Sequence, residues 1–353
     1  MKNKLFFLFF LVGIAACQHK NKANHLSDVK VFTSVVIDTL LEKEISIRAL
    51  LIDGTKIGYA GTNGQYGFID LMKNKKFNGH IIKDTLMPEF RSIAQTKDHI
   101  FMLNAGSPAL LYKISKDGSE IKKVYQDNHP KAFYNSMQFW NDTEGIAMGD
   151  PIADCFSVLI TRDTGNTWHK VPCENLPKIH TGEAAFAASN TNLVVKGNAT
   201  WMVSGGKRAR IFFSPDKGKT WEVTQTPLIQ GKTMSGIFTA DFYDSKIGFI
   251  TGGNYENPSD NSTNKAITRD GGKSWNIVAK NDGFGYASCV QFVPKSSGKA
   301  LVTVGASGLF YSPNSGEKWI QFSEDASLYT LRFMNDSTAI AAGKNKIIRL
   351  KFK

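Results

Sequence analysis

The sequence is poor in the residues that build metal and redox centres. It contains four cysteines and seven histidines among 353 residues, with no Cys-x-x-Cys pair and no cysteine–histidine cluster at metal-binding spacing. Segments with the periodicity of amphipathic helices are absent, and no glycine-rich dinucleotide fingerprint follows a strand and opens a helix. We therefore expect no metal site, no nicotinamide, flavin or haem cofactor, and a fold without helices.

Long apolar runs are also rare, and the one that stands out lies at the N-terminus. The basic stretch "MKNK" precedes "LFFLFFLVGIAA", which is too short to span a bilayer as a helix and fits a signal peptide. The run ends in "IAAC", where small residues precede Cys17 as in the bacterial lipobox. We predict a lipoprotein signal peptide over residues 1–16 and a lipidated Cys17 with a flexible tether over residues 17–29. A plain secretory signal with an incidental cysteine is the alternative.

Acidic residues are outnumbered by basic ones. Lysine and arginine total 43 against 31 aspartates and glutamates, a formal net charge of +12. The excess favours an anionic partner, such as an acidic protein, a glycan or another small anionic molecule, although a lysine-rich surface that aids solubility is an equal alternative. For a chain exported to the cell envelope, facing the periplasm or the outer surface, we expect a membrane attachment by lipid, no nucleic-acid partner and a monomer.

One short motif, Ser/Thr-x-Asp-x-Gly-x-x-Trp, occurs four times. It is spelled "TRDTGNTW", "SPDKGKTW", "TRDGGKSW" and, with asparagine for aspartate, "SPNSGEKW". The copies are spaced by roughly 45 to 55 residues, about the length of a four-stranded propeller blade. The flanks repeat as well, because "FWNDTEGIAMGD", "FYDSKIGFITGG" and "FMNDSTAIAAG" share a strand, a turn, a second strand and a glycine.

The same pattern extends toward both ends of the chain. Units without a complete motif begin near Ser46, Phe90 and Ser327, and the unit from Phe90 carries the degenerate motif "SKDGSE". The last unit is about one strand short, and Lys30–Leu40 can supply that strand and remove the free sheet edges. We predict a single all-β domain over residues 30–353, a seven-bladed β-propeller closed by an N-terminal strand, with six or eight blades as alternatives.

Turn physics explains the repeated motif better than catalysis does. The hydroxyl and the carboxylate can accept backbone hydrogen bonds within a hairpin, the glycine permits a positive φ, and the tryptophan buries a large ring. Four copies of a catalytic aspartate would have no mechanistic use, and a turn tolerates asparagine. We therefore assign a structural role to Asp163, Trp168, Asp216, Trp221, Asp270, Trp275, Asn314 and Trp319.

The motif resembles the Asp-box, or BNR repeat, of sialidases and other propellers. The overall organisation of the repeats also resembles that of WD40- and YVTN-like repeat proteins. The arrangement from Ser46 onward is similar to the exported BNR-like propellers related to the photosystem II stability and assembly factor. That resemblance implies a propeller with its Asp-boxes on the third-to-fourth strand turns, away from the ligand face. Bacterial relatives often carry the label "oxidoreductase", for which the sequence offers no cofactor motif.

If the boxes mark one face, the site lies on the other, at the starts of first strands and in the loops between second and third strands. Arg48 and Arg91 begin first strands of adjacent units, where an arginine suits bidentate binding of carboxylate or phosphate. The loops on this face add further ligand-binding candidates: Lys207, Arg208, Arg210, Asn254 and Tyr255.

Three residues on the same face are catalytic candidates: Glu183, Asp150 and Tyr286. A buried Glu183 could serve as an acid or base, and with the two arginines this set supplies the residue types of a sialidase-like hydrolase, although no proline follows Arg48 as the sialidase motif requires. The alternative is a structural salt-bridge network of the two arginines with Glu183 and Asp150.

The sequence therefore leaves several functions open. The first is a binding or assembly module for an envelope protein or an anionic ligand, and the second is the glycan hydrolase. A third is a calcium-binding loop in "NYENPSDN", a weak signal whose spacing matches no known site. Cys155 and Cys173 fall in one repeat unit and can form a disulfide, whereas Cys289 lies in an apolar strand.

Overall fold

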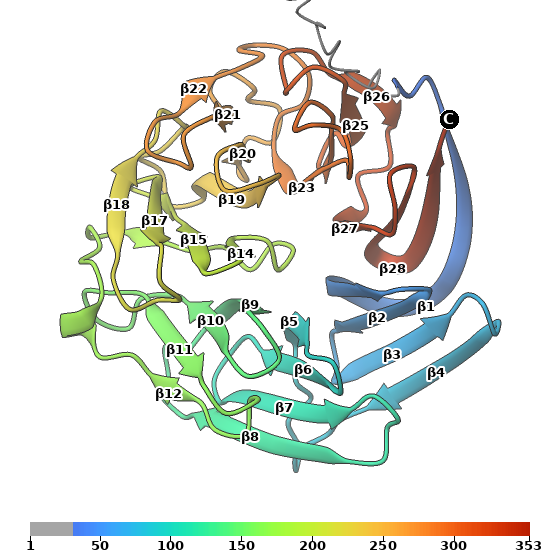
Figure 1. Cartoon of the computed structure of the whole chain (residues 1–353), viewed down its shortest axis with the longest axis vertical. Coiled ribbons are helices and arrows are strands. Elements are labelled where there is room, and N and C mark those ends of the chain that lie inside the picture. The colour runs from blue at the N-terminus through green and yellow to red at the C-terminus, as the bar shows by residue number, and fades with distance from the viewer. Residues whose placement is uncertain (1–30) are drawn as a thin grey trace, which may run out of the picture.

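The computed structural model describes residues 31–353 and shows a ring of β-sheets arranged around a central axis (Figure 1). In the part of the chain that is described, strands alternate with turns, and the one helical element is the 3₁₀ turn η1 (Cys173–Asn175). No helix among these residues is long and apolar enough to cross a membrane. The predicted all-β propeller is confirmed.

The strands form antiparallel sheets that we number along the chain. The first sheet has the order β27 (Leu328–Phe333), β28 (Thr338–Phe352), β1 (Val35–Asp53), β2 (Lys56–Gly61), β3 (Gln65–Asp70) and β4 (Lys75–His80). The second contains β5 (Phe90–Gln95), β6 (His99–Asn104), β7 (Ala109–Ser115) and β8 (Ile121–Asp127). The third contains β9 (Tyr134–Phe139), β10 (Gly145–Gly149), β11 (Ser157–Thr161) and β12 (His169–Lys170).

The remaining three sheets complete the ring. The fourth contains β14 (Leu193–Lys196), β15 (Ala199–Val203), β17 (Arg210–Ser214) and β18 (Glu222–Gln225). The fifth has the order β13 (Glu183–Ala184), β16 (Gly205–Gly206), β19 (Ser235–Phe242), β20 (Gly248–Asn254), β21 (Lys265–Thr268) and β22 (Asn276–Ile277). The sixth contains β23 (Ala287–Phe292), β24 (Leu301–Gly305), β25 (Gly308–Ser312) and β26 (Ile320–Ser323).

The prediction of seven blades is therefore wrong, because the described residues form six hydrogen-bonded sheets. The reason lies in β1, which is 19 residues long. Its first part, from Val35 to Ser46, pairs with β28, and its second part, from Ile47 to Asp53, pairs with β2. One continuous strand thus fuses the first and last repeat units into a single six-stranded sheet.

A second departure lies between β13 and β14. The sequence predicts a first strand there, but β13 has two residues, and residues 185–192, which we call the axial segment, reach toward the centre of the ring beside β14 (Figure 1). The axial segment is bonded to inner strands of several sheets. Asn190 donates to the Ile93 carbonyl (2.8 Å) and accepts from the Met137 amide (3.0 Å), and Ser189 donates to the Ser288 carbonyl (2.5 Å). The axis is therefore occupied by protein.

The four motif hairpins share one hydrogen-bond pattern. In the first, Thr161 Oγ1 donates to Asp163 (2.8 Å) and accepts from the Gly165 amide (3.0 Å), while Asp163 accepts from the Thr167 amide (3.0 Å). Gly165 has a φ of 69°, a left-handed conformation that glycine adopts at low cost. Trp168 is 5% exposed and packs among rings of the second and third sheets. Each bond is local to its hairpin, as the assigned structural role requires.

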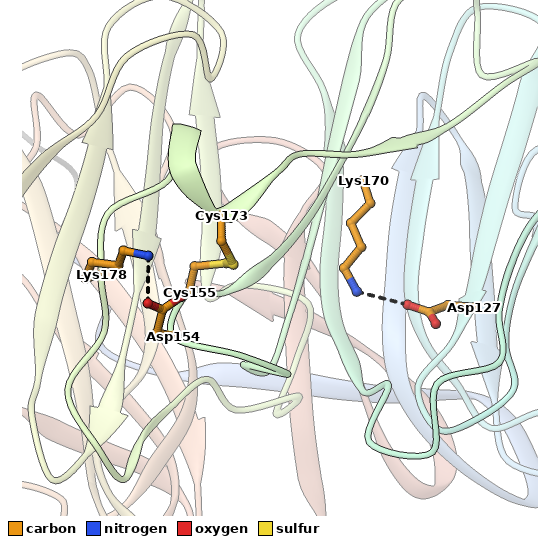
Figure 2. Close-up of a disulfide and its surroundings, with 6 residues drawn as sticks. All are labelled: Asp127, Asp154, Cys155, Lys170, Cys173 and Lys178. Atoms are coloured by element: carbon orange, nitrogen blue, oxygen red, sulfur yellow. Dashed lines mark hydrogen bonds and ion pairs between the residues drawn. A yellow bond between two sulfur atoms is a disulfide. The ribbon is translucent and has the colours of Figure 1, made fainter.

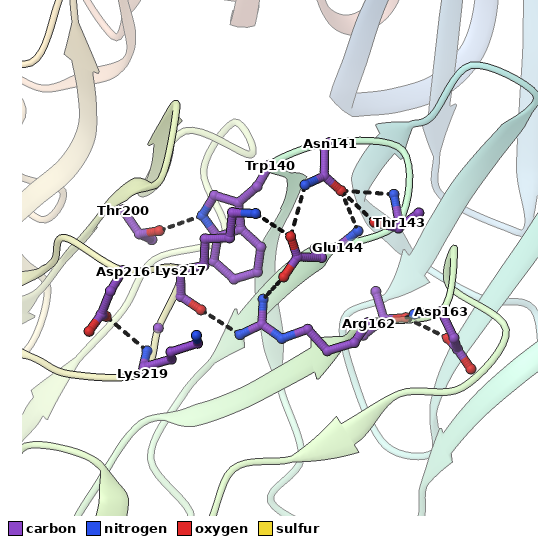
Figure 3. A network of polar contacts seen from close by, with 12 residues as sticks. Trp140, Asn141, Thr143, Glu144, Arg162, Asp163, Thr200, Asp216, Lys217 and Lys219 are labelled. Atoms are coloured by element: carbon purple, nitrogen blue, oxygen red, sulfur yellow. Dashed lines mark hydrogen bonds and ion pairs between the residues drawn. The ribbon is translucent and has the colours of Figure 1, made fainter.

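Neighbouring hairpins are also connected to each other, as Figure 3 shows for the third and fourth sheets. Arg162 donates to Glu144 (2.7 Å) and to the Lys217 carbonyl (2.7 Å), while the Lys217 ammonium also pairs with Glu144. Hydrogen bonding from Lys217 lowers the pKa of Glu144 to about 2. Trp140 bridges the same two sheets by donating to Thr200 (2.8 Å).

A disulfide joins Cys155 to Cys173, the pairing that the sequence allowed (Figure 2). Cys155 is buried in the apolar cluster that fills the space between the third and fourth sheets. Beside the sulfurs, Asp154 forms an ion pair with Lys178 (2.6 Å), in which both side chains are largely exposed. The bond ties the loop before β11 to η1, and Cys289 is a buried free thiol.

Candidate functional site

Two neighbouring cavities open on the face that carries the starts of the inner strands. The larger, of about 470 Å³, contains Arg48, Arg91 and Asp150, and the smaller, of about 360 Å³, contains Arg48 and Tyr329. Tyr255 and Tyr286, like Arg48, line both cavities. The structure thus brings together five of the residues predicted from the sequence: Arg48, Arg91, Asp150, Tyr255 and Tyr286.

Arg48 lies where the two cavities meet. Its guanidinium donates to the Ala188 carbonyl of the axial segment (3.0 Å) and stands 4.2 Å from the centre of the Tyr329 ring. Among the described residues, no carboxylate forms an ion pair with it. Burial lowers the pKa of Arg48, and the nearby charge of Arg91 lowers it further. A partly desolvated cation without a counter-ion favours an anionic ligand.

Arg91, by contrast, already has an acidic partner. It donates to Glu89 through Nε (2.8 Å) and Nη2 (2.6 Å), and its Nη1 reaches the Ala187 carbonyl (3.3 Å). Glu89 is partly exposed and is not among the residues that line the cavity. The two arginines are therefore oriented by consecutive carbonyls of the axial segment, and Arg48 is the one whose charge is left uncompensated.

A group of packed aromatic rings lines the larger cavity. Phe186 and Phe238 stack with ring centroids 3.9 Å apart, and Tyr286 meets the Phe238 ring edge-on at 4.8 Å. Tyr255, which is 53% exposed, packs edge-on against Tyr286 at 5.2 Å. Tyr286 is 7% exposed, and its hydroxyl has no hydrogen-bond partner within residues 31–353. Burial raises its pKa, so the phenol stays protonated and can donate to a ligand.

Asp150 is the carboxylate of the larger cavity. It accepts a hydrogen bond from the Ala185 amide (3.1 Å), and the Asn135 side chain lies within 3.5 Å. Burial raises the pKa of Asp150 to about 6. The group is therefore available for proton transfer near neutral pH, although no ion pair joins it to Arg48 or Arg91 in the described chain.

Glu183 has a different environment from the one that the sequence suggested. Its side chain is fully buried, and it pairs with Arg210, which donates through Nε (2.9 Å) and Nη2, while Ser204 donates to it at 2.5 Å. Neither Glu183 nor Arg210 lines either cavity. The proposed four-membered network across the channel mouth is not formed, because Glu183 belongs to this separate pair.

The other candidates lie apart from Arg48. Lys207 is exposed and donates to the Gly231 carbonyl (2.8 Å), and Arg208 is exposed. Asn254 is 2% exposed and accepts from the Glu256 amide (3.0 Å), which shapes the loop that carries Tyr255. In the same loop Asp260 accepts from Ser262, and hydrogen bonds from that residue lower its pKa. These contacts support a structural role for the loop.

Sequence reasoning missed two parts of the site. Tyr329, in "SLYTLRF", is the second residue of β27, just as Arg91 is the second residue of β5. The axial segment, "AFAASNTN", contains the residue types of a strand followed by a turn, so its position at the ring centre had no local signal. Arg332 also binds this segment, at the Ser189 carbonyl (3.0 Å), and it lines a separate cavity with Gln95 and Phe333.

Within the described residues, one group of potential metal ligands gathers: Asp154, Cys155 and Cys173. The two sulfurs are joined to each other, so they are not free thiolates. Cys17, the predicted lipidation site, lies outside the described residues, as do the predicted signal peptide and tether.

Solved structures of distant sequence share the fold. A structure of YCF48 bound to D1 peptide has a TM-score of 0.64 at 14% identity, covering 92% of this chain and 98% of that one. YCF48 from Cyanidioschyzon merolae has a TM-score of 0.64 at 12% identity, covering 91% and 98%. A GH74 enzyme from Niastella koreensis has a TM-score of 0.61 at 12% identity, covering 88% of this chain and 53% of the enzyme.

These likenesses establish a β-propeller, a fold that serves binding proteins and glycoside hydrolases alike. No protein-family profile and no curated protein sequence matches the chain. The function must therefore be argued from the cavities themselves.

Proposed function

We propose that the protein is a binding module that holds an anionic segment of a partner protein in the two cavities around Arg48. The observation that carries this proposal is the guanidinium of Arg48, which is partly buried between the cavities without a carboxylate partner. A carboxylate of the ligand would satisfy the remaining N–H donors of Arg48 and compensate its charge.

The surroundings of Arg48 support a peptide as the ligand. Tyr255, Tyr286 and Tyr329 offer broad aromatic surfaces with hydroxyl donors, a combination that is common at protein interfaces. The backbone carbonyls of the axial segment hold the arginines in place, so little side-chain order has to be created on binding. YCF48, a protein of the same fold, has been solved with a D1 peptide, which gives a precedent for peptide binding by this architecture.

The partner that we propose is an envelope protein. This part rests on the sequence, since the lipobox at Cys17 and the tether over residues 17–29 would hold the propeller near a membrane surface. In that position the cavities would meet segments of membrane or exported proteins.

Hydrolysis of a glycan is the second candidate, and Asp150 is the observation that favours it. Its pKa of about 6 suits a general acid near neutral pH. Most glycosidases, however, need two carboxyl groups across the scissile bond, and Asp150 is the one carboxylate among the residues that line the two cavities. We therefore favour binding over hydrolysis.

The test is a binding titration of the full chain with a labelled peptide rich in aspartate and glutamate, against its asparagine and glutamine counterpart. We expect the acidic peptide to bind more tightly, and Arg48→Gln to weaken it by about 10- to 100-fold, the loss of a charged hydrogen bond. Arg269→Gln is the control, because Arg269 is exposed on a motif hairpin.

A cross-linking pull-down from native envelopes with the same variants extends the test to the natural partner. A protein retained by the wild type and Arg269→Gln but lost with Arg48→Gln supports the proposal. Equal affinity of wild type and Arg48→Gln for the acidic peptide would reject it. Glycoside hydrolysis that is abolished in Asp150→Asn would favour the second candidate instead.

A further inference from the structure

The wedges between neighbouring sheets, on the side of the motif hairpins, are filled by aromatic rings in most of the molecule. Trp168 closes the wedge between the second and third sheets, 6.3 Å from the Phe101 ring, and Trp319 closes that between the fifth and sixth, 5.9 Å from Phe249. The wedge between the first and second sheets differs, because it contains a cavity of about 320 Å³.

The cavity has two causes in the sequence. The degenerate motif "SKDGSE" supplies the turn between β7 and β8 without a tryptophan. In addition, β2 lacks a ring that β6 has. In β6, Phe101 follows Ile100, whereas in β2, Gly58 follows Ile57. Gly165 abuts the Phe101 ring, whereas a Cβ on Gly118 of the degenerate turn would meet no described atom within 4 Å. The wedge between the first and second sheets therefore lacks counterparts of Phe101 and Trp168, the two rings that fill the wedge between the second and third sheets.

The floor and one side of this cavity are apolar. Leu51 and Ile100 are buried and form its floor, and Phe68 stacks with Phe77 at a centroid distance of 6.0 Å and an interplanar angle of 18°. Phe77 is 51% exposed, so an aromatic face is presented at the mouth. Apolar cavities of this kind take up apolar guests, because water gains few hydrogen bonds in them.

The lining of this cavity carries one excess positive charge, because it contains four lysines, Lys56, Lys75, Lys76 and Lys116, and three aspartates, Asp53, Asp70 and Asp117. Asp53 is paired with Lys116 (2.8 Å), and Asp70 and Asp117 accept backbone hydrogen bonds from the turns that follow them. Lys56 and Lys75 also line the cavity, and their ammonium groups form no hydrogen bond or ion pair with a described residue, although Lys56 interacts electrostatically with Asp70. Two ammonium groups without a direct hydrogen-bond partner among the described residues therefore stand beside the apolar part of the cavity.

We propose that this cavity binds a small planar aromatic carboxylate of about the size of an indole acid. The ring would enter beside Phe68 and Phe77, as the motif tryptophans enter the equivalent wedges, and the carboxylate would lie at Lys56 and Lys75. The volume of 320 Å³ is at the lower end of the range for small-molecule sites. The site is separate from the Arg48 cavities, with which it shares no lining residue.

The test is isothermal titration calorimetry of the full chain with indole-3-acetate and with indole. We expect indole-3-acetate to bind more tightly than indole, and Phe77→Ala to weaken it by about tenfold through loss of aromatic contact. Ile82→Ala is the matched control, because Ile82 is 52% exposed, as Phe77 is, and does not line the cavity.

The lysines are tested by the double variant Lys56→Gln/Lys75→Gln, with Lys97→Gln/Lys273→Gln, two exposed lysines that do not line the cavity, as the control of equal charge. We expect the first to bring the affinity for indole-3-acetate down to that for indole and the second to leave it unchanged. Equal affinities for the two ligands in the wild type would overturn the proposal, as would an absence of binding or binding that Phe77→Ala leaves unaltered. Arg48→Gln should have no effect here, which separates this site from the proposed function.

Discussion

The pair of Glu183 and Arg210 shows how burial decides the role of a charged residue. With side chains 0% and 7% exposed, it is the most buried ion pair in the described chain. Ser204 and the Lys178 carbonyl satisfy further polar atoms of the pair. Removal of one partner would leave an uncompensated buried charge, which costs about 3–5 kcal/mol. A residue held in this way stabilises the fifth sheet and cannot meet a substrate in the cavities.

Lys265 is a buried cation that forms no ion pair within residues 31–353, and its burial predicts that the stability of the fold depends on pH. It is 0% exposed, donates to Asn264 (2.6 Å) and the Phe284 carbonyl (3.0 Å), and burial lowers its pKa to about 8. The unfolded chain, with the ordinary lysine pKa of about 10.4, binds more protons between these values. The free energy of unfolding should therefore rise with pH from about 8 to about 10.

Lys265→Met should remove this rise, which amounts to about 3 kcal/mol over the window. Urea denaturation at pH 7, 8, 9 and 10 would measure the effect. Lys273→Met, a change of equal charge at an exposed position of the adjoining hairpin, is the control and should keep the slope of the wild type. If Lys265→Met and Lys273→Met have the same slope, Lys265 is not the group responsible.

At the scale of single elements, the motif hairpins explain why asparagine replaces aspartate in one copy. In the second hairpin Asp216 accepts from the Thr220 amide (2.8 Å) through Oδ1 and from the Thr220 hydroxyl (2.7 Å) through Oδ2. In the fourth, Asn314 Oδ1 accepts from the Lys318 amide (3.0 Å), and Lys318 has no hydroxyl to bond a second oxygen. The amide group of asparagine therefore loses nothing at this position.

This difference predicts that exchanging aspartate and asparagine changes the free energy of unfolding by unequal amounts in the second and fourth hairpins. Asp216→Asn should destabilise the fold by about 1 kcal/mol, the value of one hydrogen bond, because the Thr220 hydroxyl loses its acceptor. Asn314→Asp should change the free energy of unfolding by less than about 0.5 kcal/mol. Urea denaturation of both variants measures the contrast, and equal changes would show that the second oxygen contributes nothing.

These hairpins could be predicted from the sequence because the hydrogen bonds that shape each turn, such as those of Thr161 and Asp163, are local. The axial segment could not, because its partners, such as Ile93, Met137 and Ser288, lie in three different sheets far along the chain. The same limit applies to the site. Positions at strand starts predict that Arg48 and Arg91 belong to the site, whereas Glu183 fits the same pattern and pairs with Arg210 outside the cavities. Local pattern places a residue on a face, but its partners depend on tertiary packing.

For the whole molecule, the closure of the ring rests on β1. The stretch "KVFTSVVIDTLLEKEISIRALLID" contains no glycine or proline, so nothing in it ends a strand before Gly54. The repeats therefore predict the ring, but they do not show that the closing strand and the first inner strand are continuous, and this continuity determines the number of sheets. Phe32, 1% exposed, locks this closure by stacking on Phe352 at 5.0 Å and packing against Tyr311 at 5.1 Å.

Phe32→Ala should weaken this closure. Loss of a buried phenylalanine costs about 3–5 kcal/mol, and the seam between β1 and β28 should open before the rest of the ring, since it joins the two ends of the domain. Hydrogen exchange measures this directly: amides of residues 346–352 should exchange faster in Phe32→Ala, while those of β10 and β15 keep their protection. Val31→Ala, at a neighbouring position that is 56% exposed, is the control. Uniformly faster exchange in all sheets would mean that the ring unfolds as one unit and that β1 is not its weakest seam.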